Sequence, residues 1–266
     1  MDASDQIRFE PTQSGLQRLQ ARFGGHAFDL HRHETYAVGL TLWGAQSFHY
    51  RGALRTSSAG QVMVIHPDEA HDGHASVDAG FAYRMLYVDP AAVGAALCGT
   101  APFVPEVVAD DAVLAKLLRE AFADFPQALE PIAVDAIVER LATRLSARSD
   151  AGPRSKRDVT AQRAVHRARD FLVAEAPRTV ASEELERVAG LDRFALARHF
   201  RTAFGTSPHR FQVGQRLARA QAMIATGRSL SETAAATGFA DQSHLTRHFA
   251  ARFGLTPGRW AALSRA

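Results

Sequence analysis

The sequence predicts an α+β protein: a β-sandwich or small barrel with two following helices, then an all-α domain that contains two helix-turn-helix motifs. Three observations predict this fold class. Short apolar runs separated by glycine and proline occupy residues 30–90, helical periodicity begins near Val113, and a helical segment close to the C-terminus is repeated. A chain of 266 residues is long enough for two such domains.

The first region alternates apolar residues with small or polar ones at a period of two. Tyr36–Leu42 and Phe48–Tyr50 show this alternation, and the second run leads into the turn signal Arg51-Gly52. Two further apolar runs, Gln61–His66 and Phe81–Val88, each stop at or just before a proline. Closely spaced short strands of this kind are typical of sandwiches and small barrels.

Two amphipathic helices follow these strands. Apolar residues recur at helical spacing from Val113 to Phe125 and again from Val134 to Leu145, and Pro126 and Pro131 bound the loop between them. The stripes either pack on the parent domain or form a subunit interface, and the sequence leaves both interpretations open.

A domain boundary is expected between residues 153 and 154. The segment Ser149–Arg157 is polar and contains Gly152-Pro153, as linkers often do. Residues 1–153 carry 12 Lys and Arg against 19 Asp and Glu, a net charge of −7, whereas residues 154–266 carry 19 against 9, a net charge of +10. The basic half indicates a polyanionic partner for residues 154–266.

The C-terminal half contains a repeat at an offset of 49 residues. Asp192–Phe211 aligns with Asp241–Trp260, and nine of the 20 aligned positions are identical. Each copy follows a short predicted helix that ends in glycine, Glu183–Gly190 and then Glu232–Gly238. A short helix, a glycine turn and a second helix form a helix-turn-helix, so the repeat predicts two of them.

The second helix of each copy has a buried and an exposed face. The expected buried stripes are Leu196, Phe200, Ala203 and Phe204, and then Leu245, Phe249 and Phe253. The expected exposed stripes, which would meet base edges in the major groove, are Phe194, Ala197, Arg198 and Arg201, and then Gln242, Ser243, Thr246 and Arg247. Phe194 either contacts a thymine methyl group or is half-buried in the turn. Helix starts and arginines suited to phosphate contacts are Ser182, Ser207, Arg210, Arg252 and Arg259.

Residues 160–264 closely resemble the DNA-binding domain of the AraC/XylS family of bacterial transcription regulators, through the segment Gly238–Pro257. The resemblance implies seven helices, with two helix-turn-helix motifs on one long bridging helix that reach successive major grooves about 34 Å apart. It assigns the first set of base-reading positions to Phe194, Ala197 and Arg198, and the second to Gln242, Ser243, His244 and Arg247. Ala197 departs from the polar residue common at that position, so the first motif is expected to read fewer bases.

The N-terminal half is similar, over about residues 20–90, to the cupin-type sensor domain found in many members of this family. The residues concerned are His31-Arg32-His33-Glu34 and Pro67–His74. In cupin enzymes a His-x-His pair, a glutamate and a later histidine hold a metal, so His31, His33 and His71 are candidate ligands. Positions 37 and 38 hold alanine and valine where a cupin carboxylate would stand. We therefore expect no metal or other cofactor, and a polar lining or strand-end hydrogen bonds as the role of these histidines.

An effector pocket is expected inside the sandwich, which is the default small-molecule site of such a domain. Its candidate lining consists of aromatic and polar residues: His33, Tyr36, Trp43, His49, His71 and Tyr83, together with Tyr87. The family resemblance adds an arm, Ile7–Pro11, that could close over the ligand.

The expected function is a transcription regulator that binds double-stranded DNA through residues 154–266 and a small-molecule effector, with dimerisation, through residues 1–153. The alternatives are a metal-dependent cupin enzyme fused to a DNA-binding domain, and an architectural DNA-binding protein whose first half only dimerises. The missing cupin carboxylate argues against the enzyme. We expect a homodimer, with RNA polymerase as a candidate further partner. We expect no membrane association, because the chain has no long apolar run and no signal peptide. The single cysteine, Cys98, fits the cytoplasm.

Overall fold

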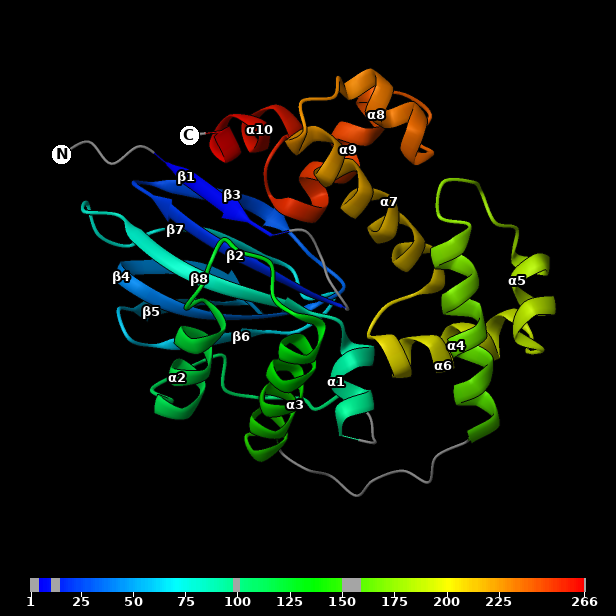
Figure 1. The fold of residues 1–266 in the computed structure, drawn as a ribbon, viewed down its shortest axis with the longest axis horizontal. Helices are drawn as coiled ribbons and strands as arrows, with labels where there is room; N and C mark the ends of the chain where they lie inside the picture. The colour runs from blue at the N-terminus through cyan, green and yellow to red at the C-terminus, as the bar shows by residue number, and fades with distance from the viewer. Residues whose placement is uncertain (1–4, 11–14, 98–100, 150–158, 266) are drawn as a thin grey trace.

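The computed structural model describes residues 5–10, 15–97, 101–149 and 159–265. An antiparallel β domain forms one side of the molecule, and helices from the second half of the chain cover one face of it and extend beyond its end (Figure 1). The predicted boundary between residues 153 and 154, Pro11 at the end of the expected arm, and Cys98 all lie outside the described residues.

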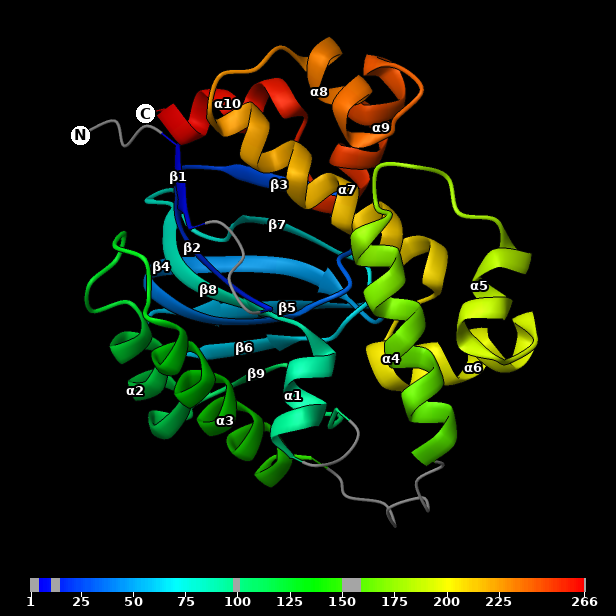
Figure 2. The same ribbon diagram turned by 45° about the vertical axis from the view of Figure 1, so that its right-hand side comes forward.

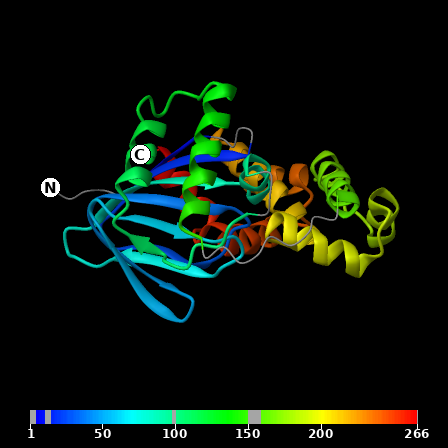
Figure 3. The same ribbon diagram turned by 90° about the horizontal axis from the view of Figure 1, so that it is seen from below.

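Nine strands are described, and all their pairings are antiparallel. They are β1 (Gln6–Phe9), β2 (Leu16–Phe23), β3 (His26–His31), β4 (Tyr36–Tyr50), β5 (Ala53–Ser58), β6 (Val62–Ile65), β7 (His71–Ala75), β8 (Phe81–Val88) and β9 (Val108–Ala109). One sheet has the order β1-β2-β8-β4-β6-β9, and the second half of β4 also pairs with β5 and β7, with β3 beyond β7. The sandwich or barrel predicted from the sequence is confirmed, and Figure 3 shows the strands curving round a common interior.

Strand β4 belongs to both sheets because it bends in the middle. The sequence predicted two strands here, but residues Tyr36–Tyr50 form one continuous strand with a register shift between Thr41 and Trp43. Gly44 lies beside the shift at φ +69°, where a Cβ atom would stand 1.9 Å from the carbonyl oxygen of Gly80. Glycine is therefore required at the bend for both conformation and space.

The two N-terminal strands are an addition to the predicted set. Ile7 lies in β1, paired with Ala21 of β2, so its segment is part of the sheet and not a free arm. A short helix, α1 (Pro90–Ala96), also precedes the two predicted ones, α2 (Ala112–Ala121) and α3 (Pro131–Ala147). These three helices cover the outer face of the sheet, where Val38, Leu40 and Leu86 are buried against them.

Seven helices are described between residues 159 and 265, and this is the number that the family resemblance implied. They are α4 (Val159–Ala174), α5 (Ser182–Ala189), α6 (Arg193–Phe204), α7 (Pro208–Ala225), α8 (Leu230–Thr237), α9 (Gln242–Phe253) and α10 (Pro257–Arg265). In Figure 2 the long helix α7 runs between α4–α6 on one side and α8–α10 on the other. No helix in the described ranges is both long and apolar enough to cross a membrane.

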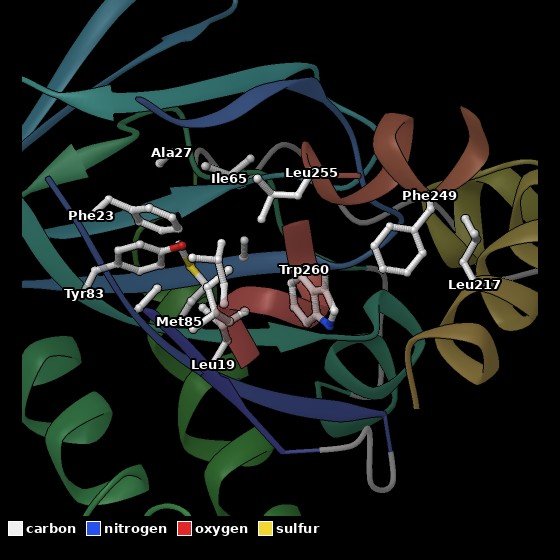
Figure 4. Packing of buried hydrophobic residues seen from close by; sticks show 14 of the residues in the cluster. Leu19, Phe23, Ala27, Ile65, Tyr83, Met85, Leu217, Phe249, Leu255 and Trp260 are labelled. Atoms are coloured by element: carbon white, nitrogen blue, oxygen red, sulfur yellow. The ribbon is translucent and has the colours of Figure 1, made fainter. Parts of the chain in front are cut away.

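The inner face of the sheet shares its core with the last four helices. Phe23, Tyr83 and Met85 from the strands belong to the same buried cluster as Phe249 of α9 and Trp260 of α10. Figure 4 shows Trp260 between the strand side chains and Phe249. Side chains from the strands and from the last four helices thus fill this part of the sandwich interior.

Candidate DNA interface and interdomain cavity

Helices α6 and α9 are the second helices of the two helix-turn-helix motifs, and local sequence fixes both of their ends. Asp192 accepts hydrogen bonds from the backbone N–H groups of Phe194 and Ala195, and Asp241 accepts one from His244. Gly205 and Gly254 end the helices in the left-handed conformation. These caps satisfy free backbone groups at each terminus.

The predicted buried and exposed faces of α6 and α9 are present. Leu196, Phe200, Phe204, Leu245 and Phe249 are buried, whereas Ala203 and Phe253 are half-buried. Solvent-exposed side chains include Phe194, which is 77% exposed, and also Ala197, Arg198, Arg201, Gln242, Ser243 and Arg247. Thr246, which was expected in the exposed stripe of α9, is half-buried. Phe194 is therefore not tucked into the turn, and Arg198 and Arg247 both face solvent.

His244 lies within the turn more than on the exposed face. It is half-buried, its ring lies against Phe239 and His248, and its Nδ1 accepts a hydrogen bond from the N–H of Ala240. Its ring is thus engaged in holding the start of α9.

Arg216 of α7 braces the two halves of the helical region, and sequence reasoning missed it. Its buried guanidinium donates to the carbonyl oxygens of Ala176, Arg178 and Gly238. Gly238 is the turn glycine of the second motif, and Ala176 follows α4 beside the first. A single arginine therefore fixes the bridging helix to both motifs. The sequence carried no clear signal for this role, because Gln212 and Gln221 are polar residues buried on the same helix.

The three arginines expected to contact phosphates are bound to the N-terminal domain in this arrangement. Arg210 pairs with Asp68, Arg252 with Glu34, and Arg259 with Asp5. Arg259 also donates to the carbonyl oxygen of His26 at 2.9 Å. Ser207 caps α7, whereas Ser182 is the first residue of α5 after the N-cap residue Ala181.

Backbone contacts draw α9 against the strand β3. The N–H of Asp29 donates to the carbonyl of Gly254 at 2.9 Å, and the N–H of Arg32 donates to that of Ala251 at 3.1 Å. A Cβ atom on Gly254 would lie 2.7 Å from Nδ1 of His31, so only glycine permits this approach.

A cavity of about 700 Å³ opens between the two halves of the molecule. Its apolar lining includes Phe9, Leu19, Phe28, Phe211, Phe253 and Trp260. Its polar lining includes Gln17, His31, His33, Glu34, Arg169, Arg219, Gln221 and Arg252. The lining residues belong both to the chain before residue 150 and to the helices after residue 158. Across this interface the side-chain amide of Gln17 donates to the side-chain oxygen of Gln221 at 3.0 Å.

Most of the predicted effector residues lie away from this cavity. His33 and Tyr87 line it, whereas Tyr36 is buried on the outer face of the sheet, where its hydroxyl donates to Pro102. Tyr83 is packed in the inner core, and Trp43 and His49 are exposed on the β domain. The cavity residues that sequence reasoning missed belong to segments about 200 positions apart, for which the chain offers no local signal.

His71 does not line the cavity, but it lies with His31 and His33 in one buried group. Burial lowers the pKa of His71 to about 4 and lowers the pKa values of His31 and His33 well below their usual value. The positive charge of Arg252 lowers the pKa values of His31 and His33 further. All three imidazoles are therefore neutral near pH 7.

Comparisons with known proteins agree with this architecture. Residues 14–145 match the family model of the AraC-like ligand binding domain, and residues 185–262 match that of a helix-turn-helix domain. No curated protein sequence matches the chain significantly.

Solved structures of ToxT from Vibrio cholerae are similar over nearly the whole chain. An apo variant has 11% identity and a TM-score of 0.66, covering 96% of this chain and 99% of that one. Wild-type ToxT bound to an unsaturated fatty acid has 11% identity and a TM-score of 0.65, covering 98% and 95%. ToxT bound to (E)-4-(8-methylnaphthalen-1-yl)but-3-enoic acid has 9% identity and a TM-score of 0.64, covering 98% and 100%.

Proposed function

We propose that this chain, which belongs to the AraC/XylS family of transcription regulators, reads its operator through α6 and α9 under the control of an effector held in the interdomain cavity. The proposed effector-binding and dimerisation domain is residues 1–153, and the proposed DNA-binding domain is residues 154–266. The observation that carries the proposal is the cavity itself, because a molecule bound there touches both domains. Such a ligand favours the present arrangement over any in which the domains part.

We infer that the effector lowers DNA affinity. In the present arrangement Arg210, Arg252 and Arg259 are bound to carboxylates of the N-terminal domain, so they are not free to contact phosphates. A ligand that stabilises these ion pairs competes with DNA for the same guanidinium groups. The coupling acts in both directions, so operator DNA also weakens effector binding.

The cavity favours an amphipathic carboxylic acid. Aromatic and aliphatic side chains would cover an apolar body, and the Nε atom of Arg252 and the Nε1 atom of Trp260 are buried donors without a partner in the described structure. A carboxylate is the acceptor that an arginine binds most strongly. Both ligands named in the ToxT structures are also acids, which supports this choice.

The effector is tested with a fatty acid and its uncharged analogue. Operator fragments are first captured from genomic DNA with the full-length protein, and affinity is then measured by fluorescence anisotropy with a cis-unsaturated fatty acid or its methyl ester. We expect the acid to weaken DNA binding at least tenfold and the ester to have little effect. Equal effects of the two compounds, or no effect of the acid, would refute the proposed effector class.

Base reading is tested separately with Arg247→Ala. A bidentate arginine–guanine contact contributes about 1–3 kcal/mol, so this variant should weaken operator binding and relax one base position. Arg228→Ala is the control, because Arg228 is exposed in the loop before α8. Weakening that is the same on every sequence would mean that Arg247 contacts only phosphate.

We further propose a homodimer that acts in the cytoplasm, has no enzymatic activity and contacts RNA polymerase when bound to DNA. The exposed apolar side chains of Val113 on α2 and Ile132 on α3 support a subunit contact on this face. Sedimentation of Ile132→Glu against the unchanged chain tests it, with loss of the dimer as the expected result.

A further inference from the structure

The two halves of the helical region have separate hydrophobic cores, although helix α7 contributes to both. Phe211, near the start of α7, packs in the cluster that contains Phe200 and Phe204 of α6. Leu217, later in the same helix, packs in the cluster that contains Phe249 of α9. The two clusters have no described residue in common, so polar contacts have to hold one motif against the other.

Arg216 lies between these two apolar segments of α7, and its side chain is buried. Its Nε atom donates to the carbonyl oxygen of Ala176 at 2.6 Å, and its Nη2 atom to that of Arg178 at 2.8 Å. Its Nη1 atom donates to the carbonyl oxygen of Gly238 at 3.0 Å. One side chain is thus hydrogen-bonded both to the loop that leads from α4 into the first motif and to the turn of the second.

Two helices end beside this guanidinium group, which makes its position favourable. Helix α4 ends at Ala174, two residues before Ala176, and α8 ends at Thr237, next to Gly238. Carbonyl groups at a helix C-terminus lack partners within the helix and form the negative end of its dipole. A planar guanidinium with five N–H donors can bind several such oxygens together, whereas the compact ammonium of lysine has no such fork.

The two motifs also approach each other directly at this point. A Cβ atom on Gly238 would stand 1.9 Å from the carbonyl oxygen of Pro177, which lies between two residues whose carbonyl groups Arg216 binds. At the equivalent turn glycine of the first motif, Gly190, a Cβ atom would make only an ordinary contact of 3.9 Å with Arg167. The close approach therefore belongs to the junction between the motifs, and glycine leaves room for it.

We propose that Arg216 sets the distance and angle between α6 and α9, and thereby the one spacing of two half-sites that this chain accepts in DNA. The inference rests on the proposed function, because it needs both helices to read the operator. Helix α7 alone is less rigid than its length suggests, since Gly214 lies in its interior and glycine weakens a helix.

The brace is independent of the β domain. All three carbonyl groups that Arg216 binds lie between residues 159 and 265, so these hydrogen bonds remain when the β domain parts from the motifs. Arg216 is therefore a positioning residue that keeps the two motifs together as one reader. An effector then changes the affinity for the operator and leaves the preferred spacing unchanged.

The spacing is tested with the captured operator and with a copy that has one base pair inserted between the half-sites, which are located by hydroxyl-radical footprinting. The insertion turns one half-site by about a tenth of a helical turn relative to the other. By fluorescence anisotropy, the unchanged full-length protein should bind the inserted copy at least tenfold more weakly. In Arg216→Met, which removes the guanidinium but keeps a long side chain, this ratio should fall below threefold. Arg219→Met is the control, because Arg219 of α7 donates to Val173 from an exposed position, and its ratio should stay above tenfold.

Further variants test the junction if Arg216→Met does not fold. Arg216→Lys keeps the charge without the fork and should also lower the ratio. Gly238→Ala forces the turn away from Pro177 with Arg216 in place and should lower the ratio as well. Gly190→Ala imposes similar left-handed strain on the first motif without that clash, so its ratio should equal that of the unchanged protein.

The ratio separates a positioning role from a merely structural one. If the Arg216 variants bind both DNA copies more weakly by the same factor, or if Gly238→Ala and Gly190→Ala have equal ratios, the inference is overturned. Equal binding of the two copies by the unchanged protein would also overturn it and would leave the proposed function standing. Absence of any sequence-specific binding would refute the proposed function, and the inference with it.

Discussion

The two helix-turn-helix motifs share a sequence pattern but are attached to the rest of the molecule unequally. Equivalent residues of the repeat contact the β domain in both: Gly205 lies against Pro67 and Gly254 against His31. The equivalent arginines, Arg210 and Arg259, each pair with an aspartate of that domain. Among the residues that the structure describes, the second motif alone adds backbone hydrogen bonds to Asp29 and Arg32, in and just after β3. It also adds an ion pair at Arg252, where the first motif has alanine at the corresponding position 203.

The cores show the same inequality. Phe249 and Trp260 belong to the cluster that fills the β domain, whereas Phe200, Phe204 and Phe211 form a separate cluster with α4, α5 and the single residue Ala91 of α1. The second motif is therefore continuous with the ligand-binding half, and the first is a neighbour of it. A change within the β domain reaches α9 directly through the shared core, whereas it reaches α6 through the contacts that α6 makes with α1 and α7.

The largest effect should come from truncating the residue at the centre of the stronger attachment. Trp260→Ala removes a buried ring that packs on Phe9 of β1 and on Phe249, and should destabilise the protein by about 3–5 kcal/mol. Phe211→Ala is the equivalent change in the first motif. In Trp260→Ala, amide hydrogen exchange should become faster in β1 and β2 as well as in α9. In Phe211→Ala, it should become faster only in α4–α7. Identical exchange patterns would mean that the two motifs are attached alike.

The next largest effect on stability should come from Gly254, the glycine at which the end of α9 packs closely against β3. Gly254→Ala places a Cβ atom against His31, Asp29 and Phe28 at φ +66°. Gly190→Ala has a similar φ of +70°, but its Cβ atom would make only an ordinary contact of 3.9 Å with Arg167. The left-handed conformation alone costs about 1–2 kcal/mol, which both variants share. The clash should add about 1–3 kcal/mol to Gly254→Ala in chemical denaturation. Equal losses would show that α9 is not held tightly against β3.

Acid should loosen the second motif before the first. Burial lowers the pKa of His71 to about 4 and lowers the pKa values of His31 and His33 well below the usual 6.5. The folded state therefore resists protonation, so stability is complete above pH 6.5 and falls as the pH decreases toward 4. Fluorescence of Trp260 in a Trp43→Phe background should shift to the red over this range. The indole introduced by Phe211→Trp, with Trp43 and Trp260 replaced by phenylalanine, should shift only at lower pH.

The smallest effects on stability belong to the paired arginines of the repeat. The side chains of Arg210 and Arg259 are 46% and 37% exposed, so Arg210→Ala and Arg259→Ala should each cost less than about 1 kcal/mol. Their effect on DNA binding should be similar for all sequences if they contact phosphates. A loss confined to the operator would contradict that role.

The helical half was the more predictable part of the chain. Asp192, Gly205 and Pro208 mark element boundaries through local backbone chemistry, and α6 and α7 begin where those residues place them. The limits and partners of the strands were harder to predict, because several strands are buried on both faces. Tyr36–Thr41 is buried at every position, and β2 carries a buried arginine, Arg18, whose partner Glu10 lies in a different segment.

The cavity could not be predicted from local pattern at all. Its polar contacts join residues such as Gln17 with Gln221 and Glu34 with Arg252, whose proximity follows only from how the two domains pack. The histidine group differs from the cavity in this respect. The resemblance to cupin-type domains already grouped His31, His33 and His71 before the structure was known. The packing added the carbonyl partners that fix their ring orientation.

The salt dependence of operator binding should also reflect the ion pairs of Arg210, Arg252 and Arg259. Each of these guanidinium groups already has a carboxylate neighbour, so under the proposed function it exchanges one anion for another when the duplex arrives. The freed carboxylates then recruit cations from the buffer while the phosphates release theirs. The slope of log affinity against log salt should consequently be shallower than the number of phosphate contacts suggests.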